Sequence, residues 1–172
     1  MCYGEGTLSK SVKAMKGNDE VVTLLNRVLY NELIAINQYF LHSRMLRNWG
    51  VTKLAEYEYK ESLDEMRHAD ELVERILFLD GLPNLQDLGK LMIGEDVEEI
   101  LQCDLKLEQS ALPDLRKGIA ACEKHSDYNS RELLVKILDG EEEHIDFLEA
   151  QFELIKRMGL ENYVQLQSKA AE

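Results

Sequence analysis

The sequence predicts an all-α protein: a four-helix bundle of two antiparallel hairpins joined by one long crossover, with a short fifth helix at the C-terminal end. Three observations predict it. Apolar residues recur every three or four positions along four long stretches. Only two prolines occur in 172 residues. The segments between the stretches are short and polar in two cases and long and glycine-containing in one.

The first hairpin is expected to join a helix over Asp19–Asn48 to a helix that runs from Thr52 to about Asp80. Gly50 suits the end of the first helix because glycine readily adopts the left-handed backbone found there. Thr52 is the expected N-cap of the second. In each helix, residues spaced three or four apart form a stripe along one face, and each stripe is apolar except for a few polar members. The first stripe contains Val21, Leu25, Val28, Glu32, Ile36 and Tyr39, and the second contains Leu54, Glu65, His68, Leu72, Ile76 and Leu79.

The second hairpin is expected to join helices over about 96–124 and 128–158. Their stripes are Leu101, Leu105, Glu108, Leu112, Leu115 and Ile119, and Leu134, Ile137, Glu141, His144, Leu148 and Ile155. Pro113 removes one backbone hydrogen bond inside the third helix, so a kink or local bulge is expected there. Residues 81–95 contain three glycines and a proline, and their length allows a crossover from one end of the bundle to the other. The amphipathic segment 160–167 is the expected fifth helix.

Composition limits the function classes. The net charge of −13 argues against nucleic acid or an anionic membrane as a partner and suits a protein that handles cations. No apolar stretch approaches the roughly 20 residues that span a bilayer. Residues 1–14 read as a flexible extension without a secretory signal, before a single domain over 15–172. The three cysteines lack metal-site spacing, which favours a reduced, cytoplasmic setting.

A duplicated motif carries the chemistry. Glu65–His68 and Glu141–His144 are both Glu-x-x-His, and each first Glu lies 33 residues after a lone Glu in an apolar stripe, Glu32 and Glu108 respectively. Measured from turns at Gly50 and Ser126, the two glutamates of each hairpin fall level to within about one helical turn. The i, i+3 spacing places the Glu and His of each motif on the same face.

The six side chains are therefore expected to meet inside the bundle as a two-metal site. Four buried carboxylates would repel one another, whereas two divalent cations balance their charge. Oxygen ligands with one imidazole per metal suit iron or manganese. A single Glu-x-x-His arises easily by chance in a Glu-rich chain, but matched offsets on apolar faces do not. His42 and His125 lack the pattern and are expected to be ordinary structural residues.

At this point the chain resembles a known family. NELIAINQYFLHSRM around Glu32, DEMRHAD around Glu65, GLPNLQDLGKL in the crossover and EEEHIDFLE around Glu141 are similar to bacterioferritin. The resemblance covers about residues 15–167. It implies a ferritin-like fold, a homo-oligomeric shell of 24 subunits and storage of iron as a ferric mineral. The ferroxidase ligands of that family fall on the same six residues, with Glu65 and Glu141 as bridging carboxylates.

The resemblance also implies a role for residues that spacing alone leaves open. Glu32 with His68 would complete one iron position and Glu108 with His144 the other. Tyr39 matches a tyrosine beside the site. Oxidation of two Fe(II) by dioxygen or peroxide would deliver two electrons as a pair.

A haem is implied as well. Met66 adjoins Glu65 and so points about 100° away from the inward face. By itself an outward Met is usually an interface residue, but the resemblance implies that it and its two-fold mate ligate one haem of b type per subunit pair. That haem would pass electrons inward for iron release, supplied by a small iron–sulfur ferredoxin. Leu82, Glu95 and Glu99 match the docking positions, and Asn162 and Gln165 match residues that line a four-fold channel.

The chain departs from the family at two positions. Lys60 stands where some members have a histidine of an inner-surface iron site, although Asp64 remains, so such a site is doubtful here. Phe147 replaces a tryptophan. Two other functions remain open: a different di-iron carboxylate oxidase or peroxidase on the same bundle, and an idle shell subunit of a mixed ferritin that contains a second subunit type.

Overall fold

A computed structural model describes residues 16–168, and within them the chain forms five helices and no strands. They are α1 (Asp19–Asn48), α2 (Thr52–Phe78), α3 (Val97–Lys124), α4 (Tyr128–Met158) and α5 (Leu160–Gln167). Both hairpins, the crossover and the fifth helix are thus confirmed. The predicted extension 1–14 lies outside the described residues.

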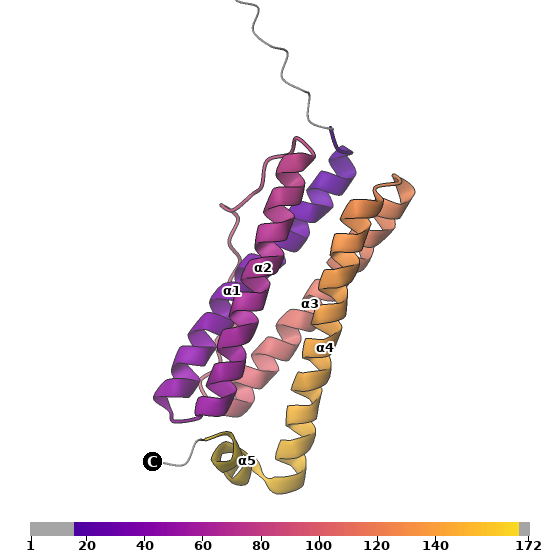
Figure 1. The fold of residues 1–172 in the computed structure, drawn as a ribbon. Coiled ribbons are helices and arrows are strands. Elements are labelled where there is room, and N and C mark those ends of the chain that lie inside the picture. The colour runs from indigo at the N-terminus through magenta and orange to yellow at the C-terminus, as the bar shows by residue number, and fades with distance from the viewer. Residues whose placement is uncertain (1–15, 169–172) are drawn as a thin grey trace, which may run out of the picture.

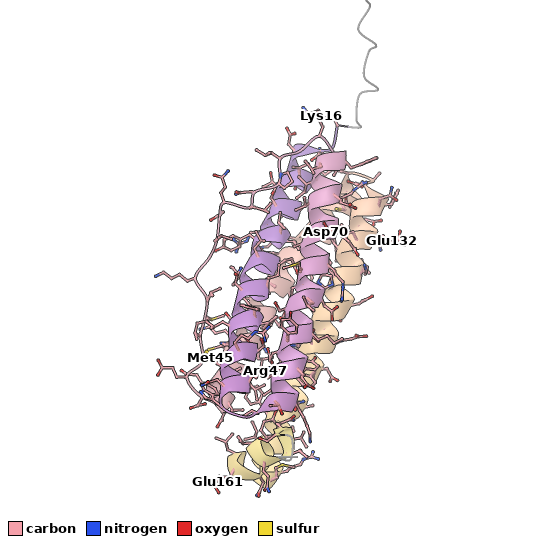
Figure 2. All side chains as sticks on the ribbon, turned by 60° about the vertical axis from the view of Figure 1, so that its left-hand side comes forward. Lys16, Met45, Arg47, Asp70, Glu132 and Glu161 are labelled. Atoms are coloured by element: carbon pink, nitrogen blue, oxygen red, sulfur yellow. The ribbon has the colours of Figure 1, made fainter. Side chains whose placement is uncertain are left out.

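The helices pair as the connections require. α1 packs along α2 and α3 along α4, while 81–95 runs outside the bundle from one end to the other (Figure 1). α1 also packs against α3, whereas α2 and α4 approach each other much less closely. α5 turns across the end of the bundle opposite Lys16 (Figure 2). This arrangement encloses a central space that all four long helices face.

Local sequence explains where the helices begin and end. The side chain of Asn18 accepts from the Glu20 amide at 2.9 Å, and Asp96 accepts from Glu99 at 2.8 Å, so both act as N-caps. Gly50 has φ +84° and lies just after the end of α1, as predicted. The expected N-cap role of Thr52 is wrong: Val51 occupies that position without a side-chain bond, and Thr52 is already the first helical residue.

α3 continues through Pro113, and its backbone shows neither a break nor a π-turn there. Glu108, one turn before Pro113, is buried in the centre of the bundle. Among residues 16–168, no helix combines the length and apolarity that crossing a bilayer requires.

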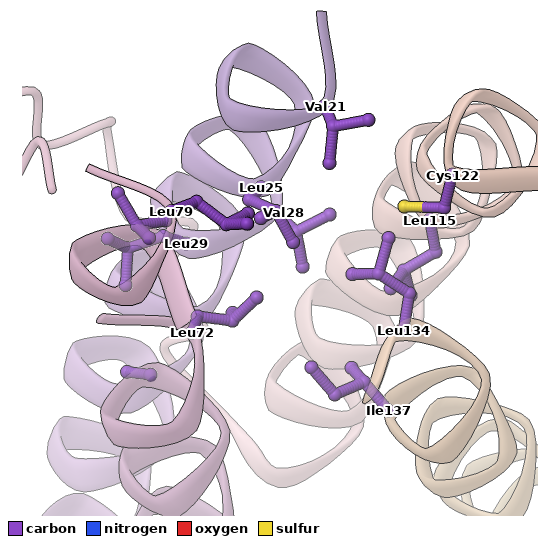
Figure 3. Close-up of a cluster of buried hydrophobic side chains, with 12 residues drawn as sticks. Val21, Leu25, Val28, Leu29, Leu72, Leu79, Leu115, Cys122, Leu134 and Ile137 are labelled. Atoms are coloured by element: carbon purple, nitrogen blue, oxygen red, sulfur yellow. The ribbon is translucent and has the colours of Figure 1, made fainter. Parts of the chain in front are cut away.

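Two apolar clusters fill the ends of the bundle. The first gathers Leu25, Leu72, Leu115 and Leu134 from the four long helices (Figure 3). The second surrounds Leu46, Leu101, Leu148 and Tyr163 near α5. On every long helix the predicted ligands fall between these clusters. The apolar clusters therefore fix the helices on both sides of a polar layer and hold it away from bulk water.

Candidate metal centre

The polar layer consists of the six residues that the duplicated motif predicts. α1 supplies Glu32, α2 Glu65 and His68, α3 Glu108, and α4 Glu141 and His144. Their ligand atoms form two groups, each within 4.8 Å: Glu32, Glu65, His68 and Glu141 in one, and Glu65, Glu108, Glu141 and His144 in the other. Glu65 and Glu141 belong to both groups. This is the geometry of two adjacent cation positions that share two bridging carboxylates.

Imidazole–carboxylate contacts hold the layer together. His68 Nδ1 lies 2.9 Å from Glu65 Oε2 and 3.4 Å from Glu32 Oε2. His144 Nδ1 lies 3.2 Å from Glu108 Oε1. Each imidazole therefore faces the carboxylates of its own half of the layer. When protonated, each supplies positive charge where a cation would otherwise be needed.

The pKa values follow from this burial and charge. Burial, and then the neighbouring carboxylates, raise the pKa of Glu32 and of Glu141 well above their usual range. Burial opposes the charge on His68, but the nearby carboxylates of Glu32 and Glu65 outweigh burial and raise its pKa to about 10. For His144 the nearby Glu108 carboxylate likewise outweighs burial and raises the pKa to about 9. Both imidazoles are thus charged at neutral pH.

In the metal-free protein, bound protons therefore offset much of the negative charge of the buried layer. The two imidazolium ions balance two of the four carboxylates, and the raised pKa values of Glu32 and Glu141 favour the protonated forms of these two carboxyls. Oxygen of Glu32 and Glu108 and both ring nitrogens of His144 still lack hydrogen-bond partners. Buried donors and acceptors without partners are costly, and a cation bound between them would satisfy these atoms.

Aromatic side chains cover the His144 half. The Tyr39 ring meets the His144 ring edge-on, with centroids 5.1 Å apart. Tyr57 lies 5.8 Å from the same ring and stacks on Phe147 at 3.6 Å with an interplanar angle of 13°. Tyr39 is completely buried, and its hydroxyl has no partner. Tyr39 thus lies beside His144, and the three aromatic rings cover one side of this half of the layer.

A cavity of about 450 Å³ opens onto the layer between α2 and α4. Its inner wall includes Glu65, His68 and His144, and its outer wall is mostly charged: Lys60, Glu61, Asp64, Arg67, Glu71, Lys136 and Glu143. Lys60 Nζ lies 3.4 Å from Asp64 Oδ2. A cation therefore already occupies the place near Asp64, which agrees with the doubt about an inner-surface iron site.

Sequence reasoning missed a second buried polar group below the layer. Asp104 accepts from Gln38 Nε2 at 2.8 Å and from His42 Nδ1 at 2.9 Å. Glu58 is fully buried, and neither of its oxygens has a hydrogen-bond partner. Burial, then repulsion from Asp104, raises its pKa. The missed signal was spacing: Glu58 precedes Glu65 by seven residues on one helical face.

His42 is a satisfied core residue, as expected. Its Nε2 accepts from the Gly94 amide at 3.1 Å, while Gln38 Oε1 accepts from the Met92 amide at 2.8 Å. These bonds fasten the crossover to the bundle. His125, the other histidine outside the motif, bonds Glu20 at 2.8 Å near the surface.

The remaining predicted residues lie on the outside. Met66 is 52% exposed and belongs to an apolar surface on α1 and α2. We call it the methionine face, and its members are Phe40, Leu41, Tyr59, Leu63 and Met66. The docking and channel residues of the resemblance, namely Leu82, Glu95, Glu99, Asn162 and Gln165, are also exposed. Exposure leaves all of them accessible to a partner, and none lies at the buried layer.

Comparison with known proteins agrees with the fold and the residue pattern. A model of the ferritin-like domain matches residues 22–158. The chain is 52% identical over 149 residues to a bacterioferritin of Mycobacterium tuberculosis, which covers 87% of this chain and 94% of that one. It is 46% identical over 158 residues to a bacterioferritin of Brucella melitensis (92% and 98%). It is 46% identical over 154 residues to a bacterial ferritin of Synechocystis (89% and 99%). With its bundle, its long crossover and its layer of four glutamates and two histidines, the chain belongs to the ferritin-like family and, within it, resembles the bacterioferritins throughout the described domain.

Proposed function

We propose that this protein stores iron and oxidises Fe(II) to Fe(III) at the buried layer. The observation that carries the proposal is the pair of overlapping four-residue groups, which share Glu65 and Glu141. Carboxylate and imidazole ligands suit iron, and two shared carboxylates hold two ions close enough to give up electrons together. Iron is the substrate here, and the protein contributes ligands at fixed positions, their charge and their burial away from water.

The six residues of the layer have different roles in binding the two ions. Glu32 and His68 complete one iron position and Glu108 and His144 the other, while the bridging pair sets the spacing. As two Fe(II) ions arrive, the protons on the carboxyls and imidazoles leave, so the buried charge stays balanced. Two Fe(II) lose one electron each to dioxygen or peroxide, which takes up two protons for each electron pair. Tyr39 and its aromatic neighbours cover one side of the His144 half.

The cavity favours this function over oxidation of an organic substrate by a related di-iron enzyme. An oxidase or oxygenase of that kind needs an apolar pocket that buries its substrate beside the metals. The cavity that reaches the layer is instead walled mainly by charged side chains, which suits small ions. Conversely, the presence of all six ligands argues against an idle subunit of a mixed shell.

An anaerobic titration of the metal-free protein with Fe(II) tests the proposal. Binding should saturate near two ions per subunit, and admission of oxygen should then oxidise both rapidly. The double variant Glu141→Ala/His144→Ala should lose the rapid phase, because one bridge and one terminal ligand disappear. Rapid oxidation unchanged in the double variant would rule the assignment out. Activity of this single subunit type alone would also exclude dependence on a second one.

We further propose that the methionine face binds haem between two subunits. The fit rests on surface chemistry: an exposed thioether stands among exposed apolar and aromatic side chains, and such patches on a soluble protein mark binding surfaces. The thioethers of Met66 and of its two-fold mate would hold the haem, and the haem would supply electron transfer toward the stored iron. Met66→Leu should abolish the visible spectrum of bound haem while leaving the Fe(II) titration intact. An unaltered spectrum would refute this role.

The same reasoning extends to the assembly. We propose a cytoplasmic shell of 24 identical subunits, with Asn162 and Gln165 of α5 at a channel. A small iron–sulfur ferredoxin would dock near Leu82, Glu95 and Glu99. The exposed side chains of Leu82, at the start of the crossover, and of Glu95 and Glu99, at its other end, would contribute apolar and negative character to such docking. Light scattering of the purified protein tests the shell by its mass.

A further inference from the structure

The crossover is attached to the bundle near its second end through the imidazole of His42. This ring, on α1, is completely buried. Its Nδ1 lies 2.9 Å and 3.0 Å from the two carboxylate oxygens of Asp104 on α3. On the other side of the ring, the Gly94 amide of the crossover donates to Nε2 at 3.1 Å. His42 thus joins α1, α3 and the crossover at one buried point.

The two partners define the protonation state of the ring. A backbone N–H can only donate, so the Nε2 atom that faces the Gly94 amide must be the unprotonated nitrogen. The proton of the neutral imidazole therefore lies on Nδ1, where the Asp104 carboxylate accepts it. A second proton would bind Nε2 and place two donors, the ring N–H and the Gly94 N–H, against each other. The bond to the crossover would then be lost.

The backbone around Gly94 leaves one direction for the response. It lies so close to the start of α3 that a Cβ on Gly94 would overlap the backbone of Ile100. Closely packed atoms cannot approach further, so movement toward α3 is blocked. When the His42 bond breaks, the crossover therefore has to move away from the bundle.

The attached segment covers one side of the buried layer. Residues 81–95 run along the outside of the bundle (Figure 1). Met92 packs there against an apolar cluster from α1 and α3, which consists of Ile34, Ala35, Tyr39 and Leu107. The Tyr39 ring in turn meets the ring of His144. Displacement of the crossover near Met92 would consequently uncover Tyr39 on the side away from the cavity between α2 and α4.

We propose that His42 is a pH-sensitive latch on the crossover. The neutral ring holds Gly94, and protonation of the ring in mild acid releases residues 92–94 and uncovers the Tyr39 side of the layer. Histidine is suited to this role because its ordinary titration range lies between about pH 5 and pH 8. The latch is a property of the protein itself and does not depend on the proposed iron chemistry.

The ionisable groups around His42 come from several helices. Asp104 of α3 touches the ring, Glu58 of α2 lies near Asp104, and His144 of α4 and Tyr163 of α5 lie near Glu58. Burial lowers the pKa of His144, but nearby carboxylates outweigh burial and raise it to about 9. Burial raises the pKa of Tyr163 above its ordinary value. Neither group changes charge in mild acid, so Glu58, whose pKa burial and then Asp104 raise, is the group to distinguish from His42.

Hydrogen exchange of the full-length, metal-free protein at about pH 7.5 and about pH 5.5 tests the latch. Rates are resolved to single amides by mass spectrometry and divided by the intrinsic rate at each pH. Protection of the Gly94 amide should fall roughly five- to tenfold in acid, as expected for loss of one hydrogen bond, and Met92 should follow. The Asn84 amide, bonded to Asn26 Oδ1 at 2.7 Å near the other end of the crossover, should keep its protection, because that acceptor does not titrate. Unchanged protection of Gly94, or an equal fall at Asn84, would overturn the proposal.

Three variants identify the group that responds to pH. In His42→Gln the pH-dependent change at Gly94 should disappear, whether or not the carboxamide restores the bond, because no group at that position titrates. In Glu58→Gln the change should persist, and its loss there would assign the response to Glu58 and overturn the role of His42. His125→Gln removes a histidine that contacts Glu20 near the surface and should behave as the native protein does.

Discussion

Metal binding should displace protons from the buried layer, and their number follows from the structure. In the metal-free protein His68 and His144 are imidazolium ions, with pKa values raised to about 10 and about 9. Burial and the neighbouring carboxylates raise the pKa values of Glu32 and Glu141 well above the usual range, which favours their protonated forms. Each of these groups must lose its proton to act as a ligand. Two divalent cations should therefore release at least the two imidazole protons near neutral pH.

The release determines how affinity depends on pH. A group with a raised pKa holds its proton in the metal-free state, so acid opposes binding and base favours it. Each released proton makes the free energy of binding more favourable by about 1.4 kcal/mol per pH unit, so the two imidazoles alone contribute about 3 kcal/mol per pH unit. The dependence should flatten as the pH rises through 9 and 10, where the imidazoles of His144 and His68 lose their protons unaided.

Calorimetric titration of the metal-free protein with Zn(II), in buffers of different ionisation enthalpy at pH 7, measures the count directly. Zinc avoids oxidation and takes the same ligand types. The expected result is release of at least two protons per two ions at pH 7, decreasing as the pH rises through 9 and 10, where the imidazoles lose their protons unaided. Release of fewer than two protons at pH 7 would refute the proton exchange derived from the burial and charge of the layer.

Two further predictions concern stability. Glu141→Gln should stabilise the metal-free protein more at pH 9 than at pH 6. Burial and the neighbouring carboxylates raise the pKa of Glu141 well above its ordinary value of 4.5, so the free-energy cost of folding with this group buried grows as the pH rises above that value. Urea unfolding at both pH values measures this, and an equal or smaller gain at pH 9 would contradict it. Asp104→Ala leaves the donors of Gln38 and His42 unpartnered, at about 1–3 kcal/mol each. It should lower the unfolding free energy accordingly and speed hydrogen exchange at the Met92 and Gly94 amides, whereas exposed Asp139→Ala should do neither.

Much of the fold followed from local signals in the sequence. Apolar periodicity predicted the helices, and the bounds of α1, α4 and α5 agree with those expected, because Asn18, Gly50 and Gly159 mark their ends chemically. The start of α2 was misjudged by one residue. Thr52 has the right side chain for an N-cap, but the backbone of Val51 takes that position, and backbone geometry at a tight turn is set by how the two helices pack.

The six residues of the layer were also predictable, because a repeated spacing encodes a repeated position in two similar hairpins. The surroundings were not. Glu58 and Asp104 look like ordinary acids in a Glu-rich chain, and only packing shows that both are buried. His42 looks like an isolated histidine until Asp104 and the Gly94 amide are seen on either side of its ring. Such roles depend on contacts between helices that share no sequence pattern.

The most direct test of the two-metal centre is a crystal soaked anaerobically with Fe(II) and measured at the iron absorption edge. Two anomalous peaks per subunit should appear inside the bundle, bridged by Glu65 and Glu141. One should lie beside Glu32 and His68 and the other beside Glu108 and His144, with ligand distances of about 2.0–2.2 Å. A layer without iron, or iron bound only at the charged outer wall of the cavity, would contradict the account.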